Sequence, residues 1–181
     1  MDRHRLWDLE GNPIGSPFEG HEDTVYDIAF SPDGQYIVSG GSDRTIRLWD
    51  LQGSQIRPAF QRHGDEVIGV AFSPDGQRIV SGSLDGTVRL WNLDGTQIGP
   101  PLQGHEGGVV GVAFSPDGQR VAHANFDGTI QLHWASWKEW IANSCNRLSH
   151  HPLLHSEEVY DEEFYQIALE VRDACNQGHW D

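Results

Sequence analysis

The fold is decided by a pattern that occurs three times in the chain. Its middle copy is Val67-Ile68-Gly69-Val70-Ala71-Phe72-Ser73-Pro74-Asp75-Gly76. The same pattern occurs earlier in the chain, at 25–34, and again later, at 109–118, with equal spacing between the copies. Its apolar half is typical of a strand that is buried on both faces. Ser-Pro-Asp-Gly favours a turn, because proline presets φ and glycine accepts a positive φ. Three copies in register predict a repeat architecture.

The rest of each period reads as three further short strands. A second apolar run follows the turn, at 36–39 and 78–81, and a third strand alternates apolar and polar residues at 45–49. Between these two strands, Asp-Gly at 85–86 and 127–128 favours a two-residue hairpin. Arg44 replaces that glycine in the first repeat, so we expect its turn to be different or slightly strained. A fourth, outer strand is predicted at 55–60 and 97–102.

Gly-His near the start of a period and Trp-Asp near its end form the signature of a propeller blade. Gly20-His21 with Trp49-Asp50 gives this signature in full, Arg62-His63 with Trp91-Asn92 is close, and Gly104-His105 with His133-Trp134 is degraded. At these residues, over about residues 3–134, the sequence resembles the WD40 repeat family. The resemblance implies an all-β fold of propeller blades and a non-catalytic protein–protein interaction scaffold, part or a shortened relative of a larger regulatory protein.

The predicted domains are a WD40 region at 1–134 and a helical tail at 135–181. The WD40 region divides into a partial blade (3–18), two complete blades (24–60 and 66–102) and a degraded blade (105–134), about three blades in all. Closed propellers usually have four to eight blades, so an incomplete propeller that starts in mid-blade is expected. Three arrangements stay open: a piece of a larger ring, self-association of copies through the open edges, and an arc that the tail protects. In a closing assembly, strand 13–18 of one copy would complete the last blade of the next.

The tail carries two apolar stripes at helical spacing, which predict an α-helical hairpin. Trp137, Trp140 and Leu148 lie on the first stripe, and the second runs through 160–175. This segment resembles the tail of bacterial WD-repeat signalling and scaffold proteins. Cys145 and Cys175, with the histidines at 150–151, leave a zinc site or a redox pair open, but each cysteine falls on an apolar face and buried cysteine is the preferred interpretation.

His21, Ser39 and Asp43 contain the residue types of a hydrolase triad. The set recurs in the next repeat, and a propeller needs no active site in every blade. The WD40 resemblance instead implies buried structural tetrads, which are His21, Ser39, Asp43 and Trp49, and then His63, Ser81, Asp85 and Trp91. We therefore prefer a structural role for these residues.

The third copy of this set is incomplete. His105 and Asp127 remain as a partial tetrad, but His123 and His133 stand where serine and tryptophan are expected. A metal site made of the three histidines is one interpretation, because imidazoles suit zinc or copper. Decay of a terminal blade is the preferred one, and this blade should then be the least stable of the three.

The inter-blade loops and hairpin turns are the candidate surface for binding a protein partner. Their acidic positions could offer a basic partner a rim of negative charge, and their turn positions differ between blades, which can encode partner choice. These candidate residues are Glu22, Asp23, Asp65, Glu66 and Glu106 in the loops, with Arg44, Leu84 and Phe126 in the turns.

Charge and composition exclude several classes of partner. With 12 Lys+Arg against 27 Asp+Glu, the net charge of −15 argues against nucleic acid and against an anionic membrane surface. No apolar run is long enough to span a membrane. The start of the sequence lacks the apolar stretch of a secretory signal and two cysteines make no disulfide scaffold, so a cytoplasmic location is expected. We expect no cofactor. The sequence contains no phosphate loop or nucleophile-elbow motif. The alternative is a sensor or regulatory fragment of a signalling NTPase or protease whose catalytic domain lies outside this chain.

Overall fold

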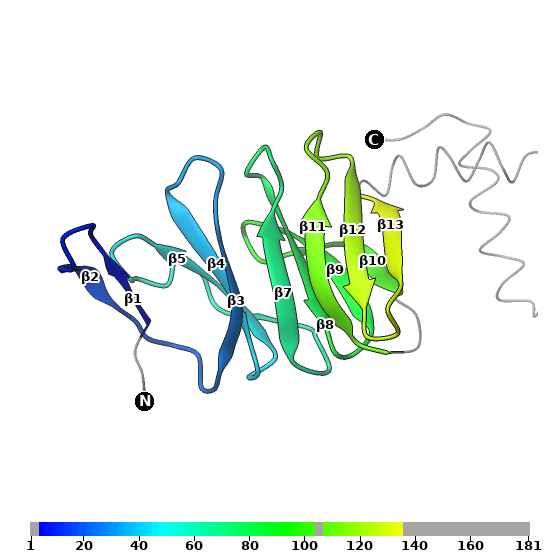
Figure 1. The fold of residues 1–181 in the computed structure, drawn as a ribbon, viewed down its shortest axis with the longest axis horizontal. Helices are drawn as coiled ribbons and strands as arrows, with labels where there is room; N and C mark the ends of the chain where they lie inside the picture. Colours follow the sequence, from blue (N-terminus) through cyan, green and yellow to red (C-terminus); the bar gives the residue numbers. More distant parts are fainter. Residues whose placement is uncertain (1–3, 104–106, 136–181) are drawn as a thin grey trace, which may run out of the picture. The chain divides into compact units, whose positions relative to one another are not determined.

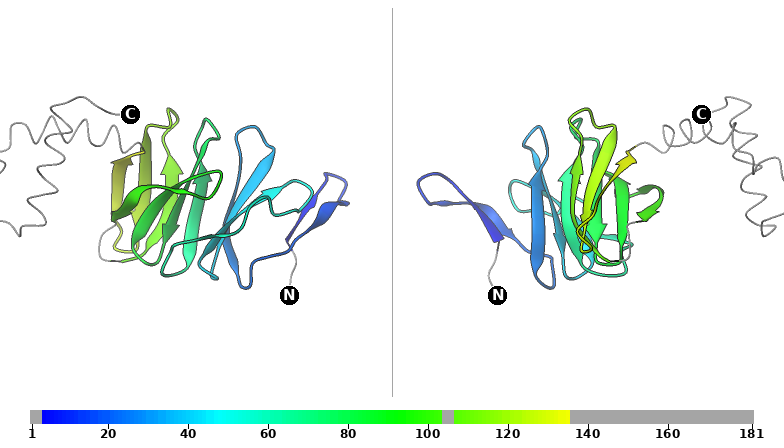
Figure 2. Two further views of the ribbon diagram at one scale, coloured as in Figure 1. Left: turned by 180° about the vertical axis from the view of Figure 1, so that it is seen from behind. Right: turned by 45° about the vertical axis from the view of Figure 1, so that its right-hand side comes forward.

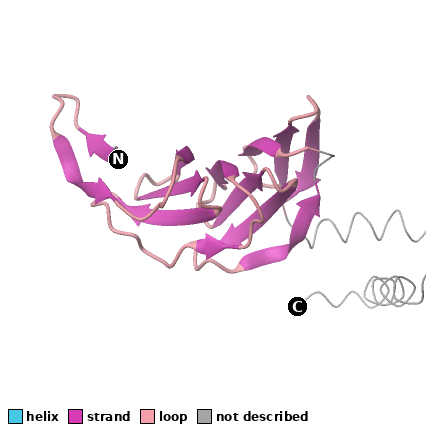
Figure 3. Ribbon diagram, turned by 90° about the horizontal axis from the view of Figure 1, so that it is seen from below, coloured by secondary structure: helices cyan, strands magenta, loops and turns pink. Residues whose placement is uncertain are grey.

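The computed structural model describes residues 4–103 and 107–135. All regular structure in these residues is β, as the magenta strands of Figure 3 show, and none of it is helical. The chain divides into two units, Met1–His133 and Trp134–Asp181. The described residues confirm the predicted all-β fold, whereas the predicted helical hairpin of 135–181 lies outside them, except for residue 135.

Thirteen strands form four antiparallel sheets among the described residues, and each sheet keeps the order of the chain (Figure 1). We call these sheets the N-terminal hairpin, the first blade, the second blade and the third blade. Their strands are β1 (His4–Trp7) and β2 (Pro13–Phe18); β3 (Val25–Phe30), β4 (Tyr36–Gly41), β5 (Thr45–Asp50) and β6 (Phe60–Gln61); β7 (Val67–Phe72), β8 (Arg78–Ser83), β9 (Thr87–Asn92) and β10 (Gln97–Gln103); and β11 (Val109–Phe114), β12 (Arg120–Asn125) and β13 (Ile130–Trp134).

The outer strand of the first blade differs from its prediction. A strand was expected at 55–60, but β6 contains only Phe60 and Gln61, and Gln55 forms an isolated bridge with Trp49. Pro58 lies between these two contacts and has no N–H to donate to a ladder, so pairing stops there. In the second blade β10 is seven residues long, but its register shifts between Ile98 and Leu102, around its two prolines.

The turns between the second and third strands of the two complete blades are wider than predicted. Three residues, not two, separate β4 from β5 and β8 from β9, and the N–H of Gly86 donates to the carbonyl of Ser83. This is a turn that ends in a left-handed residue, with Gly86 at φ 80°. Arg44 adopts the same conformation, at φ 65°, although it carries a Cβ. Its turn is therefore the same as that of the second blade, and it is strained.

The inner strands β3, β7 and β11 lie side by side, and the sheets follow one another in chain order in all three views of Figures 1 and 2. The face of the first blade that carries Val38, Ile46 and Leu48 packs on the face of the second blade that carries Val70 and Trp91. We call the face of a blade that meets the preceding sheet its upstream face, and the opposite one its downstream face.

Two glycines allow the sheets to approach closely. A Cβ at Gly40 would lie 2.7 Å from Cγ1 of Val67, and one at Gly82 would lie 2.5 Å from Cγ1 of Val109. Both glycines occupy the same position on the second strand of their blades. A side chain there must therefore displace the inner strand of the next blade.

Candidate functional site

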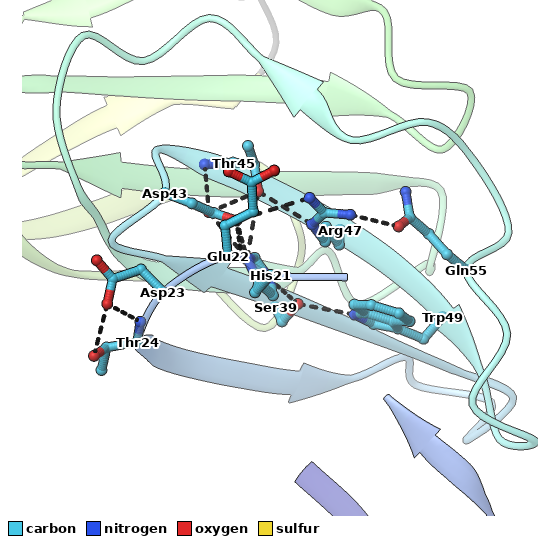
Figure 4. A network of polar contacts seen from close by, with 10 residues as sticks. All are labelled: His21, Glu22, Asp23, Thr24, Ser39, Asp43, Thr45, Arg47, Trp49 and Gln55. Atoms are coloured by element: carbon cyan, nitrogen blue, oxygen red, sulfur yellow. Dashed lines mark hydrogen bonds and ion pairs between the residues drawn. The ribbon is translucent and has the colours of Figure 1, made fainter. Parts of the chain in front are cut away.

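A chain of hydrogen bonds runs through the first blade, from Trp49 to Asp43 (Figure 4). The indole Nε1–H of Trp49 donates to Oγ of Ser39 at 2.8 Å, and Ser39 Oγ lies 2.7 Å from Nε2 of His21. Nδ1 of His21 lies 2.9 Å from a carboxylate oxygen of Asp43. These hydrogen bonds connect the loop before β3, the strands β4 and β5, and the turn between these two strands. We call these four residues the first tetrad.

The second blade repeats this geometry, and we call its set the second tetrad. Trp91 Nε1–H donates to Ser81 Oγ at 2.9 Å, Ser81 Oγ lies 2.7 Å from His63 Nε2, and His63 Nδ1 lies 3.0 Å from Asp85. Because tryptophan can only donate, the serine hydroxyl donates to His63 Nε2, and the protonated Nδ1 then donates to Asp85. Ser81 is fully buried.

The environment of the second tetrad fixes its charges. Burial alone would raise the pKa of Asp85, but hydrogen bonds from the Thr87 hydroxyl, from the N–H groups of Gly64 and Thr87, and from His63 lower it to about 2. Burial lowers the pKa of His63, although the neighbouring carboxylate opposes this. At neutral pH the pair is therefore an ionised Asp85 beside an uncharged His63.

In each tetrad the serine contacts the histidine and the histidine contacts the aspartate, as in a catalytic triad, but the serine oxygen also accepts a hydrogen bond from tryptophan. Each oxygen accepts the indole N–H of a tryptophan and donates to a histidine, so the hydroxyl has a fixed partner on both sides. Ser39 and Ser81 are both buried. In each blade these hydrogen bonds join side chains from the second and third strands to the histidine of the loop before the inner strand.

The third blade contains a pair of histidines in place of serine and tryptophan. The Nε2 atoms of His123 and His133 lie 3.0 Å apart, with their rings stacked at a centroid distance of 5.1 Å. Nδ1 of His123 lies 3.0 Å from Oδ1 of Asn125, whose amide nitrogen donates to Thr129. A larger residue thus replaces serine while a smaller one replaces tryptophan, and the two changes compensate in volume. Burial, and then the neighbouring His123, lower the pKa of His133.

The metal interpretations involve residues beyond the described ranges. His105 lies outside them, so the partial tetrad of His105 and Asp127 and the three-histidine site stay predictions, as do the roles of Cys145 and Cys175. Within 4–103 and 107–135, no group of three or more His, Cys, Asp or Glu residues could hold a metal ion. The carboxylate of Asp127 accepts hydrogen bonds from the backbone and hydroxyl of Thr129.

The predicted partner-binding residues lie at one end of the sheets, in the loops before the inner strands and in the turns between second and third strands. Seven of the eight are described, and we call these seven the rim; Glu106 lies outside the described residues. The exposed members are Glu22, Asp23, Arg44, Asp65 and Phe126, and the half-buried ones are Glu66 and Leu84.

Several rim residues also join neighbouring blades. The Ser42 hydroxyl donates to the Glu66 carboxylate at 2.6 Å, and the Arg44 guanidinium donates to the carbonyl of Gly64 at 3.4 Å. Leu84 packs closely on Gly108: a Cβ at Gly108 would lie 2.7 Å from Cα and Cδ2 of Leu84. A turn of one blade thus touches the loop of the next, which fixes the spacing of the rim.

Asp27 is a residue that the sequence patterns did not single out. Its carboxylate accepts a hydrogen bond from the backbone N–H of Val70, 2.9 Å away on the next inner strand, and another from Ile28. The equivalent positions of the next two repeats are Gly69 and Gly111. The sequence does carry a signal for Asp27, because it is a charged residue at a position where both later copies have glycine.

A family model described as WD domain, G-beta repeat, matches residues 11–50, 54–92 and 96–133. The chain belongs to the WD40 repeat family. Each matched WD40 stretch begins with the outer strand of one sheet and ends with the third strand of the next, as β2 to β5 show for 11–50. The sequence repeat and the structural blade are therefore offset by one strand. WD40 repeats are consistent with a role as a protein-interaction scaffold. In the described part of the chain, no helix has the length and apolarity to cross a membrane.

Proposed function

We propose that this WD40 chain is a non-catalytic scaffold that binds a protein partner at the rim. The observation that supports this most is that the turns share one backbone conformation while the residues in them differ from blade to blade. The turns of the two complete blades have the same backbone, yet their residues differ. The first turn position holds Ser42, Leu84 and Phe126 in the three blades, and Arg44 stands where the later blades have Gly86 and Gly128. Such variation on a fixed frame can encode partner choice.

The partner that fits this rim carries a basic segment. Glu22, Asp23 and Asp65 are exposed, and Glu66 is half-buried beside them, so four carboxylates gather at one end of two adjacent blades. The chain as a whole has a net charge of −15, which adds a long-range attraction for cations. Attraction of this kind raises the association rate more than it deepens the affinity, and salt weakens it.

The tetrads support this function indirectly, because each anchors a loop of the rim. The Asp43 carboxylate accepts the backbone N–H of Glu22 at 3.1 Å, and the Asp85 carboxylate accepts that of Gly64 at 2.8 Å. In our proposal these carboxylates hold the acidic loops in place before a partner arrives. Preorganisation of this kind lowers the entropy cost of binding.

Fluorescence anisotropy with a labelled, Arg- and Lys-rich peptide of alternating basic and serine residues tests the proposal. The rim variant carries Glu22→Gln, Asp23→Asn, Asp65→Asn and Glu66→Gln, and its amide side chains can still accept the local hydrogen bonds. We expect this variant to bind the peptide at least about tenfold more weakly than the natural chain at low salt.

The control variant has the same net charge as the rim variant. It neutralises four carboxylates outside the described residues, by Glu157→Gln, Glu158→Gln, Glu162→Gln and Glu163→Gln. If the rim binds the basic peptide, this control keeps most of the affinity. Equal losses in both variants would show that only the overall charge matters and would contradict the proposed rim.

A further inference from the structure

The upstream face of the first blade is open at its inner strand. In the second blade the first blade covers this face, and Val70 and Phe72 on β7 are only 3% and 8% exposed. At the equivalent positions of β3, one repeat earlier, Ile28 and Phe30 are 60% and 54% exposed. Val25, nearer the rim on the same strand, is half-buried, whereas its equivalent Val67 is fully buried. A row of apolar side chains along one strand is thus left uncovered.

The N-terminal hairpin covers only the outer part of this upstream face. Phe18 on β2 packs edge-on against Trp49, with ring centroids 5.7 Å apart, and Ser16 N–H donates to the carbonyl of Gln52. A hollow of about 80 Å³ remains between this hairpin and the first blade; Leu6 and Phe18 line it on one side, with Val25, Ile28 and Ile37 on the other. In the repeat pattern β1 is equivalent to β5 and is therefore a third strand, and β2 is the outer strand that follows it.

The strands that would precede β1 in a complete blade are missing from the described residues. There β1 pairs only with β2, so its other edge has no partner strand. Trp7 is 59% exposed, whereas its equivalents Trp49 and Trp91 are buried and donate to a serine on the adjacent second strand. The open edge of β1 and the open face of β3 lie around the same hollow and together form one surface, which we call the acceptor surface (Leu6, Trp7, Val25, Ile28 and Phe30).

We infer that the acceptor surface binds a β-hairpin whose two strands are like β7 and β8. The chain itself shows this contact twice, because β3 and β4 cover the upstream face of the second blade and β7 and β8 contact the inner strand of the third. The second strand of the incoming hairpin pairs with the edge of β1 through backbone hydrogen bonds, and its first strand lies on β3.

Two positions of the incoming hairpin are specified by this contact. Ser81 pairs in register with Arg89, which is equivalent to Arg5, so a serine opposite Arg5 is placed to accept the indole N–H of Trp7. The next residue is glycine, because a Cβ at Gly82 would lie 2.5 Å from Val109, the equivalent of Val25. The partner is therefore a hairpin with Ser-Gly in its second strand and aliphatic residues in its first.

A second copy of this chain fits the acceptor surface poorly. Its third blade already contains β13, the equivalent of β1, so a copy that docks there brings the same strand twice. Removing β13 to make room would separate His133 from His123. The third blade also has Ala124 at the position of Gly40 and Gly82, where a Cβ meets the next inner strand. Closure of a ring by strand 13–18 of a neighbouring copy meets the same obstacle.

A synthetic peptide of residues 66–86, which contains β7 and β8, is the first probe. Added to the full chain, it should bind saturably in calorimetry and shift the fluorescence of Trp7 to shorter wavelength, a shift that the Trp7→Phe chain lacks. Ile28→Asp should weaken binding about tenfold or more, because a carboxylate would be buried against apolar strands. Leu132→Asp, which changes an exposed apolar residue on the third blade, should leave binding unchanged.

Isolated hairpins are only marginally stable, so a covalent version of the test does not depend on the free peptide. Residues 66–87 joined directly to His4 preserve the order of strands in a blade, since residue 88 is equivalent to residue 4. This fusion should shield Trp7 from acrylamide and slow amide hydrogen exchange in β3. The same fusion with Gly82→Val in the added segment should do neither.

The inference is wrong if neither the peptide nor the fusion shields Trp7. It is also wrong if the Gly82→Val fusion shields Trp7 as well as the unchanged one does. A dimer of the chain alone that Ile28→Asp dissociates would assign the surface to a second copy and overturn the partner named above. Binding of a basic peptide at the rim is a separate measurement, and its result leaves this one unaffected.

Discussion

Asp27 and Val70 join two neighbouring sheets: the carboxylate on β3 accepts the backbone N–H on β7 at 2.9 Å. Because the other carboxylate oxygen accepts the N–H of Ile28, one side chain pairs two backbone donors. Asp27→Ala leaves both donors without this acceptor and should lower the free energy of unfolding by about 1–3 kcal/mol, measured by urea denaturation. Asp27→Asn keeps one acceptor oxygen and should fall between Asp27→Ala and the natural chain. An Asp27→Ala chain as stable as the natural one would show that this bond contributes nothing.

The serines of the two tetrads should differ in their contribution to stability. Ser81→Ala leaves Trp91 Nε1–H and His63 Nε2 unpaired in a buried place, at a cost of about 2–4 kcal/mol. Ser39→Ala removes the same bonds, but Ser39 borders the hollow beside the N-terminal hairpin, where water can replace the lost hydroxyl. We expect a cost of about 1–2 kcal/mol there, also by urea denaturation. A larger cost for Ser39→Ala than for Ser81→Ala would contradict this account.

Arg44 should be a position at which glycine stabilises the chain. At φ 65° a Cβ is strained by about 1–2 kcal/mol. Glycine is more flexible in the unfolded chain, and Arg44→Gly also removes the exposed hydrogen bond to the Gly64 carbonyl, so the net gain in stability should be up to about 1 kcal/mol. The matched control is Gly86→Ala, at φ 80° in the equivalent turn, where the nearest atom to a new Cβ is 3.9 Å away. That change should destabilise the chain by about 1–2 kcal/mol through conformation alone. Thermal unfolding of both variants measures the direction of each change in stability. If both variants changed stability in the same direction, the proposed strain at Arg44 would be refuted.

Acid should destabilise the second blade in two stages. The folded pKa of His63 lies below its ordinary 6.5, so protonation favours the unfolded chain, and stability falls as the pH drops below about 6.5. The folded pKa of Asp85 is about 2 against an ordinary 3.8, so its contribution is present above 3.8 and is lost as the pH falls toward 2. The thermal midpoint should therefore be nearly constant from pH 7 to 8 and decrease below that range. His63→Gln should make the decrease between pH 6.5 and 4 less steep, whereas a midpoint that rises on acidification would contradict the assigned protonation states.

Local patterns predicted the strands well, because each period repeats both the apolar runs and their turns. They also singled out the residues of both tetrads, since His21 and His63 recur together with their serine, aspartate and tryptophan. What the sequence could not show depends on distances between sheets. The bond from Val70 to Asp27 and the stacking of His123 on His133 arise only when strands far apart in the chain meet. The shortness of β6 depends on where the ladder hydrogen bonds of β5 run out, which strand propensity does not specify.

Hydrogen exchange of the chain with and without the basic peptide tests the rim most directly. The two ends of each blade provide an internal comparison, because Val25 pairs with Gly41 at the rim end and Phe30 pairs with Ile37 at the other. We predict slower exchange in the loops 22–24 and 64–66 and in the turns 42–44 and 84–86 when the peptide is bound. The Ser-Pro-Asp-Gly turns at 31–34, 73–76 and 115–118 should exchange as before. Protection of these turns, with no change at the rim, would contradict the account.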